Sequence, residues 1–551
     1  MELSPSAHVD TFCRDRLPPF EQWPELLFEL PELVYPDRLN CAVALLDDTA
    51  ARHGADRACL HTPDETWTYA DLQRAARQVA RVLVDDHGLV PGNRVLLRGP
   101  NNPWLVASWF GVLRAGGVVV TTMPLLRAHE LTTLCAISTP VVAICDHRFL
   151  GELDTAAVPG LATIAYGGPG DADLTARCAA VGNADFPPVD TAADDVALVA
   201  FTSGTTGRPK ATLHFHRDVL ANADTFSRHV LAPRPDDVFT GTPPLGFTFG
   251  LGGLVVFPLR AGASTLLVER ATPEELVDLI DRFGVQVLFT APTFYRAVIA
   301  TGAAERLAGL RRCVSAGEAL PADVWHRFRD ATGLRIIDGI GATEMLHVFI
   351  SAADDAIRPG ATGLPVPGYR AEVLGADGTP APDGEPGPLV VKGPTGCRYL
   401  DDERQAAYVR DGWNHTGDTY IRDADGYFWY QARSDDMIVS SGYNIAGPEV
   451  EDALLAHPDV LECGVVGAPD EARGTIVKAY VVLRPGVPSG DDTAKALQAF
   501  AKAAIAPYKY PRAVEFVDAL PRTGTGKLRR TELRAWAAAH AGTRDTTSRR
   551  A

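Results

Sequence analysis

An apolar strand that runs into a loop of glycine and hydroxyl residues is the feature that most constrains this chain. Residues 196–200 are all apolar, and residues 201–210 read Phe-Thr-Ser-Gly-Thr-Thr-Gly-Arg-Pro-Lys. A short apolar run of this kind predicts a buried strand. Gly204 and Gly207 permit the positive φ angles and close backbone approach that suit a phosphate group, and Lys210 adds a positive charge. We therefore expect a phosphate-binding turn at the end of a buried strand.

The spacing distinguishes this loop from the Walker phosphate loop. The Walker pattern has four residues between its glycines and a lysine directly after the second, whereas two residues separate Gly204 from Gly207 and Lys210 follows three positions later. An ordinary polar turn is the alternative interpretation, because glycine, serine and threonine are common in turns for local reasons. Motifs elsewhere in the chain decide between the two.

The length of the chain indicates its number of domains, and its charge limits the partners that it binds. At 551 residues it is too long for one hydrophobic core, so two or more domains are expected. A content of 46% hydrophobic and 22% charged residues is that of a soluble globular protein. The formal net charge of −17 argues against nucleic acid and against an anionic membrane surface as partners.

Cysteine usage and the absence of targeting segments predict a cytoplasmic protein. The nine cysteines are scattered, none forms a Cys-x-x-Cys pair and no histidine cluster accompanies them, so no zinc site is expected. An odd, dispersed set is typical of reduced thiols. The N-terminus lacks the basic and apolar segments of a signal peptide, and no window approaches the length of an apolar membrane span.

The pattern of apolar runs predicts an α/β fold with a separate C-terminal part. Strand patterns alternate with helix patterns over residues 40–200 and again over 196–345, which is typical of doubly wound sheets covered by helices. Over residues 360–430, short runs separated by Gly, Pro and Asp predict a small antiparallel β unit. A boundary falls at residues 432–436, and the rest of the chain predicts a compact α+β domain.

The phosphate loop resembles that of the adenylate-forming enzymes, the superfamily of acyl-CoA synthetases, peptide-synthetase adenylation domains and luciferases. Ala211 stands where this family usually has a glycine. Other segments match the family in its order, among them residues 315–318 (Ser-Ala-Gly-Glu), 341–344 (Gly-Ala-Thr-Glu), 413–418 and 521–527. The resemblance covers nearly the whole chain, so the polar-turn interpretation of the loop is set aside.

The resemblance implies that these motifs form an ATP site. Glu344 would hold Mg²⁺ against the phosphates, since carboxylate and phosphate oxygens are the ligands that this ion prefers. Thr343 would contact the α-phosphate. Asp418 would accept hydrogen bonds from the ribose hydroxyls, and Arg433 would be a second ribose contact. Residues 315–318 would lie against adenine, with Asp338 near it. The residues implied to contact ATP or, for the last three, the pantetheine arm of coenzyme A are Thr202, Ser203, Gly204, Thr205, Thr206, Gly207, Lys210, Ala316, Gly317, Glu318, Asp338, Gly339, Ile340, Gly341, Asp418, Arg433, Ser441, Gly442 and Tyr443.

The implied reaction has two steps on two domains. The carboxylate of an acid attacks the α-phosphate of ATP, giving an acyl-adenylate and pyrophosphate; a thiol then attacks the acyl carbonyl and AMP leaves. Two anions must meet in the first step, so positioning and charge neutralisation are expected to carry the catalysis. Lys527 would bridge them, and the C-terminal domain would rotate about Asp435 between the steps. The expected domains are residues 1–434, which hold the ATP and acyl sites, and a mobile domain of residues 435–551.

The stretches expected to line the acyl pocket are rich in glycine and aromatic residues. Such a lining suits a small flat ring better than a long chain. Within the superfamily, residues 338–347 and 441–451 resemble the benzoate-CoA ligase group, and the second segment is most similar to its 2-aminobenzoate members. The resemblance places His347 at the pocket floor. The residues expected to line the pocket are Phe247, Phe249, Ala291, Gly341 and His347.

Three histidines have more than one interpretation. His347 either hydrogen-bonds a substituent of the ring, or packs inside the protein and is satisfied by backbone groups. His214 and His216 are expected on one strand just past the phosphate loop, with the spacing of one strand face. Because no carboxylate or third ligand accompanies them, they are interpreted as structural residues and not as a metal pair.

We therefore expect an acid–thiol ligase that uses ATP, Mg²⁺ and coenzyme A to convert a benzoate or 2-aminobenzoate type of acid into its aryl-CoA. An enzyme that loads a carrier protein is the nearest alternative, since Lys509, Arg529 and Arg530 would serve either the phosphates of coenzyme A or an acidic carrier helix. A luciferase-like oxygenase and a non-catalytic nucleotide-binding module are more distant alternatives. The intact Lys527 and Glu344 argue against the non-catalytic module. A monomer and a homodimer are both compatible with the sequence, which does not identify the ring substituent.

Overall fold

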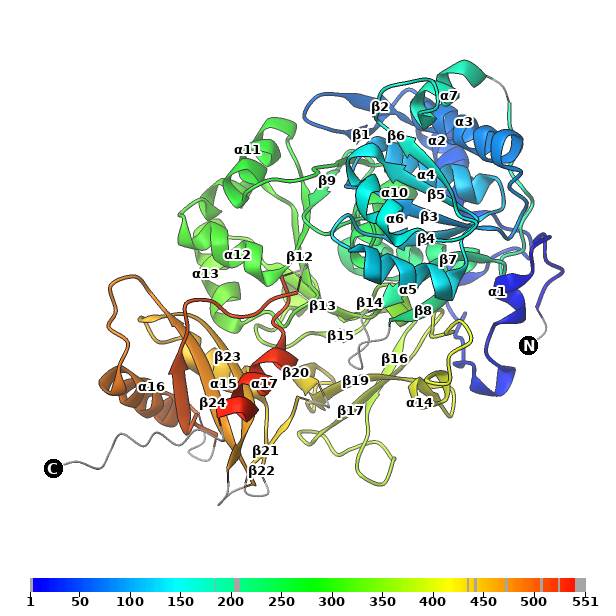
Figure 1. Ribbon diagram of the computed structural model, residues 1–551. Helices are drawn as coiled ribbons and strands as arrows, with labels where there is room; N and C mark the ends of the chain where they lie inside the picture. The colour runs from blue at the N-terminus through cyan, green and yellow to red at the C-terminus, as the bar shows by residue number, and fades with distance from the viewer. Residues whose placement is uncertain are drawn as a thin grey trace.

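The chain folds into a large N-terminal part and a small C-terminal part. The structure is a computed structural model that describes residues 3–183, 185–202, 209–433, 436–440, 443–470, 474–505, 509–523 and 526–540. In Figure 1 the N-terminal part, blue to yellow, carries two large sheets and a smaller one, and the C-terminal part, orange to red, lies against one side of it. Within these residues, no helix combines the length and the apolar character that crossing a bilayer requires.

The first large sheet ends in the predicted phosphate loop. Its six strands lie in the order β6-β5-β3-β4-β7-β8, and every neighbouring pair is parallel except β7 with β8. β3, β4 and β5 are buried at every residue, as expected for strands covered on both faces. Thr202 and Lys210 form the final pair of β7 and β8. The strands are β3 (Arg94–Arg98), β4 (Val118–Thr122), β5 (Val142–Asp146), β6 (Ala162–Tyr166), β7 (Val196–Thr202) and β8 (Lys210–Phe215).

Helices in the first third of the chain follow the predicted periodic runs. α3 begins at a capping box in which the Thr68 hydroxyl accepts a hydrogen bond from the Asp71 backbone N–H, and it ends at Gly88 in the left-handed conformation. α4 is buried along almost its whole length because it lies between the two large sheets. The helices are α1 (Phe12–Asp15), α2 (Asp48–His53), α3 (Tyr69–His87), α4 (Pro103–Arg114), α5 (Ala128–Ser138), α6 (Leu150–Ala156) and α7 (Leu174–Val181).

The second large sheet carries the other predicted motifs of the N-terminal part. Its nine strands lie in the order β15-β14-β13-β12-β11-β9-β10-β1-β2, parallel in the middle and antiparallel where β2, β14 and β15 join. The strands are β1 (Ala58–His61), β2 (Thr66–Thr68), β9 (Val238–Gly241), β10 (Ser264–Leu266), β11 (Val287–Thr290), β12 (Arg312–Ala316), β13 (Ile336–Gly341), β14 (Val348–Ser351) and β15 (Leu364–Pro365). The helices are α8 (His216–Asn222), α9 (Thr248–Leu251), α10 (Phe257–Ala261), α11 (Pro273–Phe283), α12 (Pro292–Ala300) and α13 (Ala322–Thr332).

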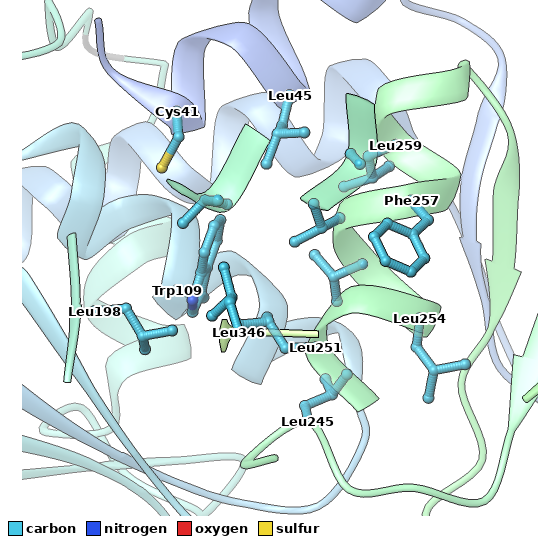
Figure 2. Close-up of a cluster of buried hydrophobic side chains, with 14 of the residues drawn as sticks. Cys41, Leu45, Trp109, Leu198, Leu245, Leu251, Leu254, Phe257, Leu259 and Leu346 are labelled. Atoms are coloured by element: carbon cyan, nitrogen blue, oxygen red, sulfur yellow. The ribbon is translucent and has the colours of Figure 1, made fainter. Parts of the chain in front are cut away.

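One apolar core joins the two large sheets. Figure 2 shows Trp109 of α4 and Leu198 of β7, from the first sheet, beside Leu251 of α9 and Leu346, which precedes β14 of the second. All four side chains are buried. Burial of each large apolar side chain contributes about 1.5–3 kcal/mol, so the two sheets are held in a fixed relation. The motifs that they carry are therefore fixed relative to one another as well.

The predicted small β unit is present and packs on the first sheet. Its five antiparallel strands have the order β16-β17-β19-β18, with β20 also paired to β19. Residues 398–400, in the link between β17 and β18, lie along β8, where the Leu400 N–H donates to the Ala211 carbonyl at 2.9 Å. The elements are β16 (Arg370–Val373), β17 (Pro386–Lys392), α14 (Gln405–Tyr408), β18 (Val409–Arg410), β19 (Trp413–Arg422) and β20 (Phe428–Arg433).

The C-terminal part is an α+β unit built on a three-stranded sheet. β23 pairs antiparallel with β24, and β24 pairs in parallel with β25. The α/β class with a smaller α+β C-terminal part is confirmed, although β25, α17 and the β21–β22 hairpin were not predicted. The elements are β21 (Ile438–Ser440), β22 (Tyr443–Ile445), α15 (Gly447–Leu455), β23 (Val460–Asp470), β24 (Gly474–Leu483), α16 (Asp491–Ala504), β25 (Ala513–Phe516) and α17 (Arg530–His540).

A fully buried ion pair ties the small β unit to the first sheet. Arg398 Nη1 lies 2.7 Å from Asp218 Oδ2, and neither side chain has exposed surface. The same carboxylate oxygen accepts a hydrogen bond from the Phe215 N–H at 2.9 Å, and the guanidinium lies 4.1 Å above the Phe215 ring. Removing one partner leaves the other charge buried without compensation, which is much more costly than losing a surface pair.

Asp218→Asn is expected to lower the free energy of unfolding by about 3–5 kcal/mol. The matched control is Asp355→Asn, because Asp355 pairs with Arg335 at the surface and its side chain is 98% exposed. That control should cost less than about 1 kcal/mol. Denaturant unfolding followed by tryptophan fluorescence measures both values, and equal unfolding midpoints for the two variants would show that the buried pair has no special structural role.

Candidate functional site

Strands of both large sheets end around the predicted phosphate site. Thr202 and Lys210 flank the phosphate loop at the ends of β7 and β8. Thr343 and Glu344 lie in the short 3₁₀ helix Thr343–Met345, which follows β13 directly. Ligand sites of open α/β sheets commonly lie outside the carboxyl ends of the strands. The predicted loop residues Ser203, Gly204, Thr205, Thr206 and Gly207 lie outside the described residues.

Lys210, Tyr399 and Glu344 form a hydrogen-bonded cluster between the sheets. Lys210 Nζ donates to the Tyr399 hydroxyl at 2.9 Å, and that hydroxyl donates to Glu344 Oε1 at 2.6 Å. Lys210 Nζ lies 3.9 Å from the same carboxylate oxygen. Burial, with the nearby Cys397 and Glu344, raises the pKa of Tyr399. Its hydroxyl therefore keeps its proton and acts as a donor to the carboxylate.

Sequence reasoning did not find Tyr399. It lies 55 residues after Glu344, and no motif surrounds it. Its place follows from the pairing of residues 398–400 with β8, which is a tertiary contact between distant segments. The one local sign was a run of large side chains, Arg398, Tyr399 and Leu400, in a stretch otherwise rich in polar and small residues.

The residues at Glu344 fit a magnesium ion held mainly by substrate phosphates. Mg²⁺ in nucleotide sites is usually bound by one or two carboxylates together with phosphate oxygens and water. Glu344 is a buried carboxylate that is 7% exposed, and Lys210 lies beside it to meet further phosphate charge. Among the described residues, no three His, Cys, Asp or Glu side chains group as an all-protein metal cage.

β12 and β13 carry the segments predicted to face adenine. They pair in parallel, with Ala316 opposite Gly339 and Ser315 opposite Asp338. Gly317 follows β12 with a φ of 91°, a conformation that strongly favours glycine. Asp338 Oδ1 has no hydrogen-bond partner in the part of the chain that the structure describes, and burial raises the pKa of Asp338 to about 7. Oδ1 of Asp338 is therefore a buried polar atom without a hydrogen-bond partner among the described residues, and it lies beside the position predicted for adenine.

Ile340, Gly341 and Glu318 lie at the ends of the same two strands. Gly341 is exposed and Ile340 is half-buried. A Cβ on Gly341 would lie 2.7 Å from the His347 carbonyl oxygen, so a larger residue does not fit. Burial raises the pKa of Glu318, and the nearby cationic side chains, Lys527 among them, oppose this rise. These residues form a narrow surface made largely of backbone.

Asp418 and Arg433 face each other across β19 and β20. They are opposite residues in the strand register, and Arg433 Nη1 donates to Asp418 Oδ1 at 3.1 Å. Asp418 is 6% exposed, and burial raises its pKa while Arg433 opposes the rise. The Asp418 backbone N–H donates to the Thr416 hydroxyl at 3.1 Å and fixes the turn. The predicted ribose pair is thus assembled as one unit.

The C-terminal part brings Lys527 to the predicted adenine segment. Lys527 closes a turn in which the Thr523 N–H donates to the Lys527 carbonyl at 2.8 Å and the Gly526 N–H to the Thr523 carbonyl at 2.9 Å. A Cβ built on Gly317 would lie 3.8 Å from Lys527 Cε. Although the lysine side chain remains exposed, the protein packed around it lowers the pKa of Lys527, and Glu318 opposes this. The two parts of the chain therefore meet at this point.

Other residues predicted to act in the C-terminal part are only partly placed. Asp435, Ser441 and Gly442 lie outside the described residues, and Tyr443 begins β22. Lys509 Nζ donates to both carboxylate oxygens of Glu449, at 2.6 and 2.7 Å. Arg530 is paired in the same way with a carboxylate, that of Glu451, while Arg529 is exposed.

Phe249 and His347 meet in a cluster of aromatic rings. The His347 ring centroid lies 5.5 Å from that of Phe249, 4.5 Å from that of Phe257 and 6.4 Å from that of Phe289. His347 is 3% exposed, and within the described residues neither ring nitrogen has a hydrogen-bond partner. Burial lowers the pKa of His347 to about 3, so its ring is neutral. The Phe249 backbone opposes this fall in pKa, so the interpretation of His347 as a packed residue met by backbone groups stays open beside the ring-binding one.

The other predicted pocket residues surround this cluster. Phe247 and Ala291 are half-buried and precede the first turns of α9 and α12. Phe289, two positions before Ala291, packs against Phe249 with ring centroids 5.5 Å apart. Gly341 packs on the His347 backbone. The structure thus joins Phe249, Gly341 and His347 by direct contacts and puts Phe247 and Ala291 at adjacent helix starts.

His214 and His216 are both buried, but they do not share a strand as expected. β8 ends at Phe215, and His216 begins α8. His216 Nδ1 accepts a hydrogen bond from the Cys41 N–H at 3.1 Å. Burial lowers the pKa of His214 to about 4 and that of His216 to about 3, so both rings are neutral.

Removing the charge of Arg433 is expected to change the pH dependence of ATP binding. Because Arg433 lowers the pKa of Asp418 against the effect of burial, Arg433→Gln should raise that pKa further. ATP binding that needs the ionised Asp418 carboxylate weakens as the pH falls. In this variant the weakening should begin at a higher pH than in the wild type. Dissociation constants for ATP measured from pH 4 to pH 8 give the midpoint pH of this weakening. Arg433→Lys keeps the charge and should shift it less; a midpoint that is the same in all three proteins would contradict the pairing.

Comparisons with known proteins agree with this arrangement. The model of the AMP-binding enzyme family matches residues 46–398, and that of the AMP-binding enzyme C-terminal domain matches residues 449–527. The chain is 35% identical to a benzoate–CoA ligase of Thauera aromatica, covering 92% of this chain and 97% of the relative. It is 34% identical to a 4-hydroxybenzoate–CoA/benzoate–CoA ligase of Rhodopseudomonas palustris, over 90% of this chain and 94% of that one.

Solved structures give the same result. An anthranilate CoA ligase in complex with anthranoyl-AMP is 33% identical, with a TM-score of 0.88 over 93% of this chain and 100% of that chain. A benzoate CoA ligase from Burkholderia xenovorans is 32% identical, with a TM-score of 0.82 over 90% of this chain and 100% of that one. The fold is shared along nearly the whole length of the chain. The chain belongs to the AMP-binding enzyme family, and it is an AMP-forming acyl-CoA ligase of that family.

Proposed function

We propose that this enzyme activates a small aromatic acid of the benzoate or 2-aminobenzoate type with ATP and transfers the aryl group to coenzyme A. The observation that carries the proposal is the aromatic floor around His347. Phe249, Phe257 and Phe289 pack around the histidine, and a lining of aromatic rings suits a flat ring better than a long chain. Relatives named for benzoate and anthranilate support the same class of acid.

The imidazole of His347 is the feature that favours a ring with a substituent. A buried polar atom without a partner is unfavourable by about 1–3 kcal/mol, so a ligand that supplies the partner gains binding energy. Nδ1 and Nε2 both lack one among the described residues. A neutral imidazole has one donor and one acceptor nitrogen, and a 2-amino or 2-hydroxy group matches either. An unsubstituted benzoate fills the space without satisfying the histidine.

In the adenylation step the residues of the predicted ATP site bring two anions together. Asp418 holds the ribose hydroxyls, and Ala316, Gly317 and Asp338 face the adenine ring. Lys210 and Lys527 neutralise charge on the phosphates and on the acid, whose carboxylate oxygen attacks the α-phosphate as pyrophosphate leaves. Thr343 contacts that phosphate. Bound at Glu344, Mg²⁺ would neutralise further phosphate charge during the displacement.

In the second step a thiol takes the acyl group and AMP leaves. We propose that residues 435–551 rotate about Asp435, so that Lys527 withdraws and the segment with Ser441, Gly442 and Tyr443 meets the pantetheine arm. The same mechanism serves coenzyme A or a carrier protein, since both present this thiol. We favour coenzyme A because the relatives compared above, which match nearly the whole chain, are named as CoA ligases.

The test of the proposed function is AMP release with ATP and Mg²⁺ over benzoate, 2-aminobenzoate, 2-hydroxybenzoate, cinnamate and octanoate, each with and without coenzyme A. Turnover on a benzoate that requires coenzyme A is expected, with little on octanoate. His347→Phe should lower the preference for 2-aminobenzoate over benzoate by up to about tenfold, the worth of one hydrogen bond. Pyrophosphate release without a response to coenzyme A would indicate a carrier protein instead, and preference for octanoate would contradict the proposal.

Lys527→Ala is expected to separate the two steps. Adenylation, measured by exchange of pyrophosphate into ATP, should fall by at least about a hundredfold, since the lysine contacts both anions in that step only. Thioester formation from supplied aryl-adenylate should stay within about threefold of the wild type, a change of less than 1 kcal/mol in the barrier. Lys495→Ala is the control, because Lys495 is an exposed lysine of α16 in the same part of the chain and has no predicted role in the site. Equal loss of both steps in Lys527→Ala would contradict the assigned role.

A further inference from the structure

The hydroxyl of Tyr399 lies between the two charged side chains of the phosphate site. It accepts a hydrogen bond from Lys210 Nζ at 2.9 Å and donates one to Glu344 Oε1 at 2.6 Å. The direct distance from Lys210 Nζ to Glu344 Oε1 is 3.9 Å. The two hydrogen bonds of the phenol are therefore shorter than the ion pair that they bridge, and bonds to charged groups at these lengths are of the strong kind.

The backbone that carries Tyr399 is held in place on several sides. Its N–H donates to Gln405 Oε1 at 2.9 Å. Residues 398–400 pair with β8, the strand that begins with Lys210. The preceding residue, Arg398, makes the fully buried ion pair with Asp218. Because the backbone of this segment pairs with β8 and the Tyr399 N–H is bonded to Gln405, the phenol is kept in one position between the two charges.

We propose that Tyr399 is a positioning residue for Mg-ATP. Its hydroxyl donates to Oε1 of Glu344, the residue that would hold the metal. It also keeps the Lys210 ammonium beside the carboxylate but 3.9 Å from Oε1, so that the two charges do not form a direct hydrogen-bonded pair. This inference rests on the proposed function, in which Glu344 and Lys210 meet Mg²⁺ and the phosphates. Tyr399 itself reacts with nothing, and its effect reaches ATP through the two residues that it touches.

Loss of the hydroxyl has a specific consequence in this arrangement. Without the phenol between them, Lys210 and Glu344 are free to form a direct ion pair at ordinary hydrogen-bonding distance. Mg-ATP then has to separate that pair before it binds, so both the affinity for the nucleotide and the response to Mg²⁺ should weaken. Thioester formation from a ready-made adenylate needs neither pyrophosphate nor the metal and should be spared.

The chain offers a matched control in Tyr408. Its ring centroid lies 5.7 Å from that of Tyr399, and Lys210 Nζ lies 5.7 Å from its centre. Its hydroxyl is buried, yet it has no hydrogen-bond partner within the described residues. Tyr408→Phe therefore removes a buried phenol oxygen from the same place without removing a contact to Lys210 or Glu344.

The experiment measures the dissociation constant of ATP by calorimetry at a series of Mg²⁺ concentrations, together with thioester formation from supplied 2-aminobenzoyl-adenylate. Tyr399→Phe should weaken Mg-ATP binding by about ten- to a hundredfold, the usual effect of losing a hydrogen bond to a charged group, and should need more Mg²⁺ for half-maximal binding. Tyr408→Phe should stay within about twofold of the wild type, since no hydrogen bond is lost. Thioester formation should be retained in both.

Two results would overturn the inference: a Tyr399→Phe protein that binds Mg-ATP with the wild-type response to Mg²⁺, or one that loses both half-reactions equally. Should Tyr399→Phe fold poorly, a fluorinated tyrosine incorporated at position 399 keeps the ring and the hydroxyl and changes only its hydrogen-bond strength; an unchanged Mg²⁺ response would then count against the inference. A wild-type protein that binds no Mg-ATP would instead refute the proposed function, so the two failures are distinguishable.

Discussion

The pairing of β8 on both of its edges is the interaction on which the active site depends. On one edge β7 runs antiparallel to it, so that Thr202 and Lys210, the residues on either side of the predicted phosphate loop, lie opposite each other. On the other edge residues 398–400 add a short stretch of extended chain and bring Tyr399 beside Lys210. The buried ion pair between Arg398 and Asp218 holds this stretch of chain to α8. A lysine, a phenol and a carboxylate from three distant segments are thereby brought together.

The rest of the site follows from where the strands of the second sheet and the small β unit end. β12 and β13 supply a surface of backbone and small residues, which suits a flat base, and β19 and β20 supply the Asp418–Arg433 pair. Lys527 reaches this surface from the C-terminal part. The residues predicted to be catalytic are thus divided between two parts of the chain, as the proposed two-step reaction with a moving C-terminal part requires.

Much of this was predictable from the sequence because it is local. Strands and helices such as β3, α4 and α11 follow from apolar periodicity, and the resemblance of the motifs at 202–210, 315–318 and 341–344 to those of the adenylate-forming enzymes predicts the nucleotide site. What was not predictable depends on tertiary contacts. Tyr399 is 55 residues from Glu344, and nothing local indicates that they touch. His216 was expected on a strand, but the capping of α8 ends β8 one residue earlier. For His347, burial without a hydrogen-bond partner is a property of packing and not of sequence.

The most direct test of the account is a crystal structure with a non-hydrolysable analogue of 2-aminobenzoyl-adenylate. We predict that the ribose hydroxyls lie on Asp418, that the aromatic ring lies against Phe249, and that its amino group is within hydrogen-bonding distance of His347. A ring bound elsewhere, such as in the apolar pocket lined by Trp109, Leu245 and Leu251, with His347 still without a partner, would contradict the account.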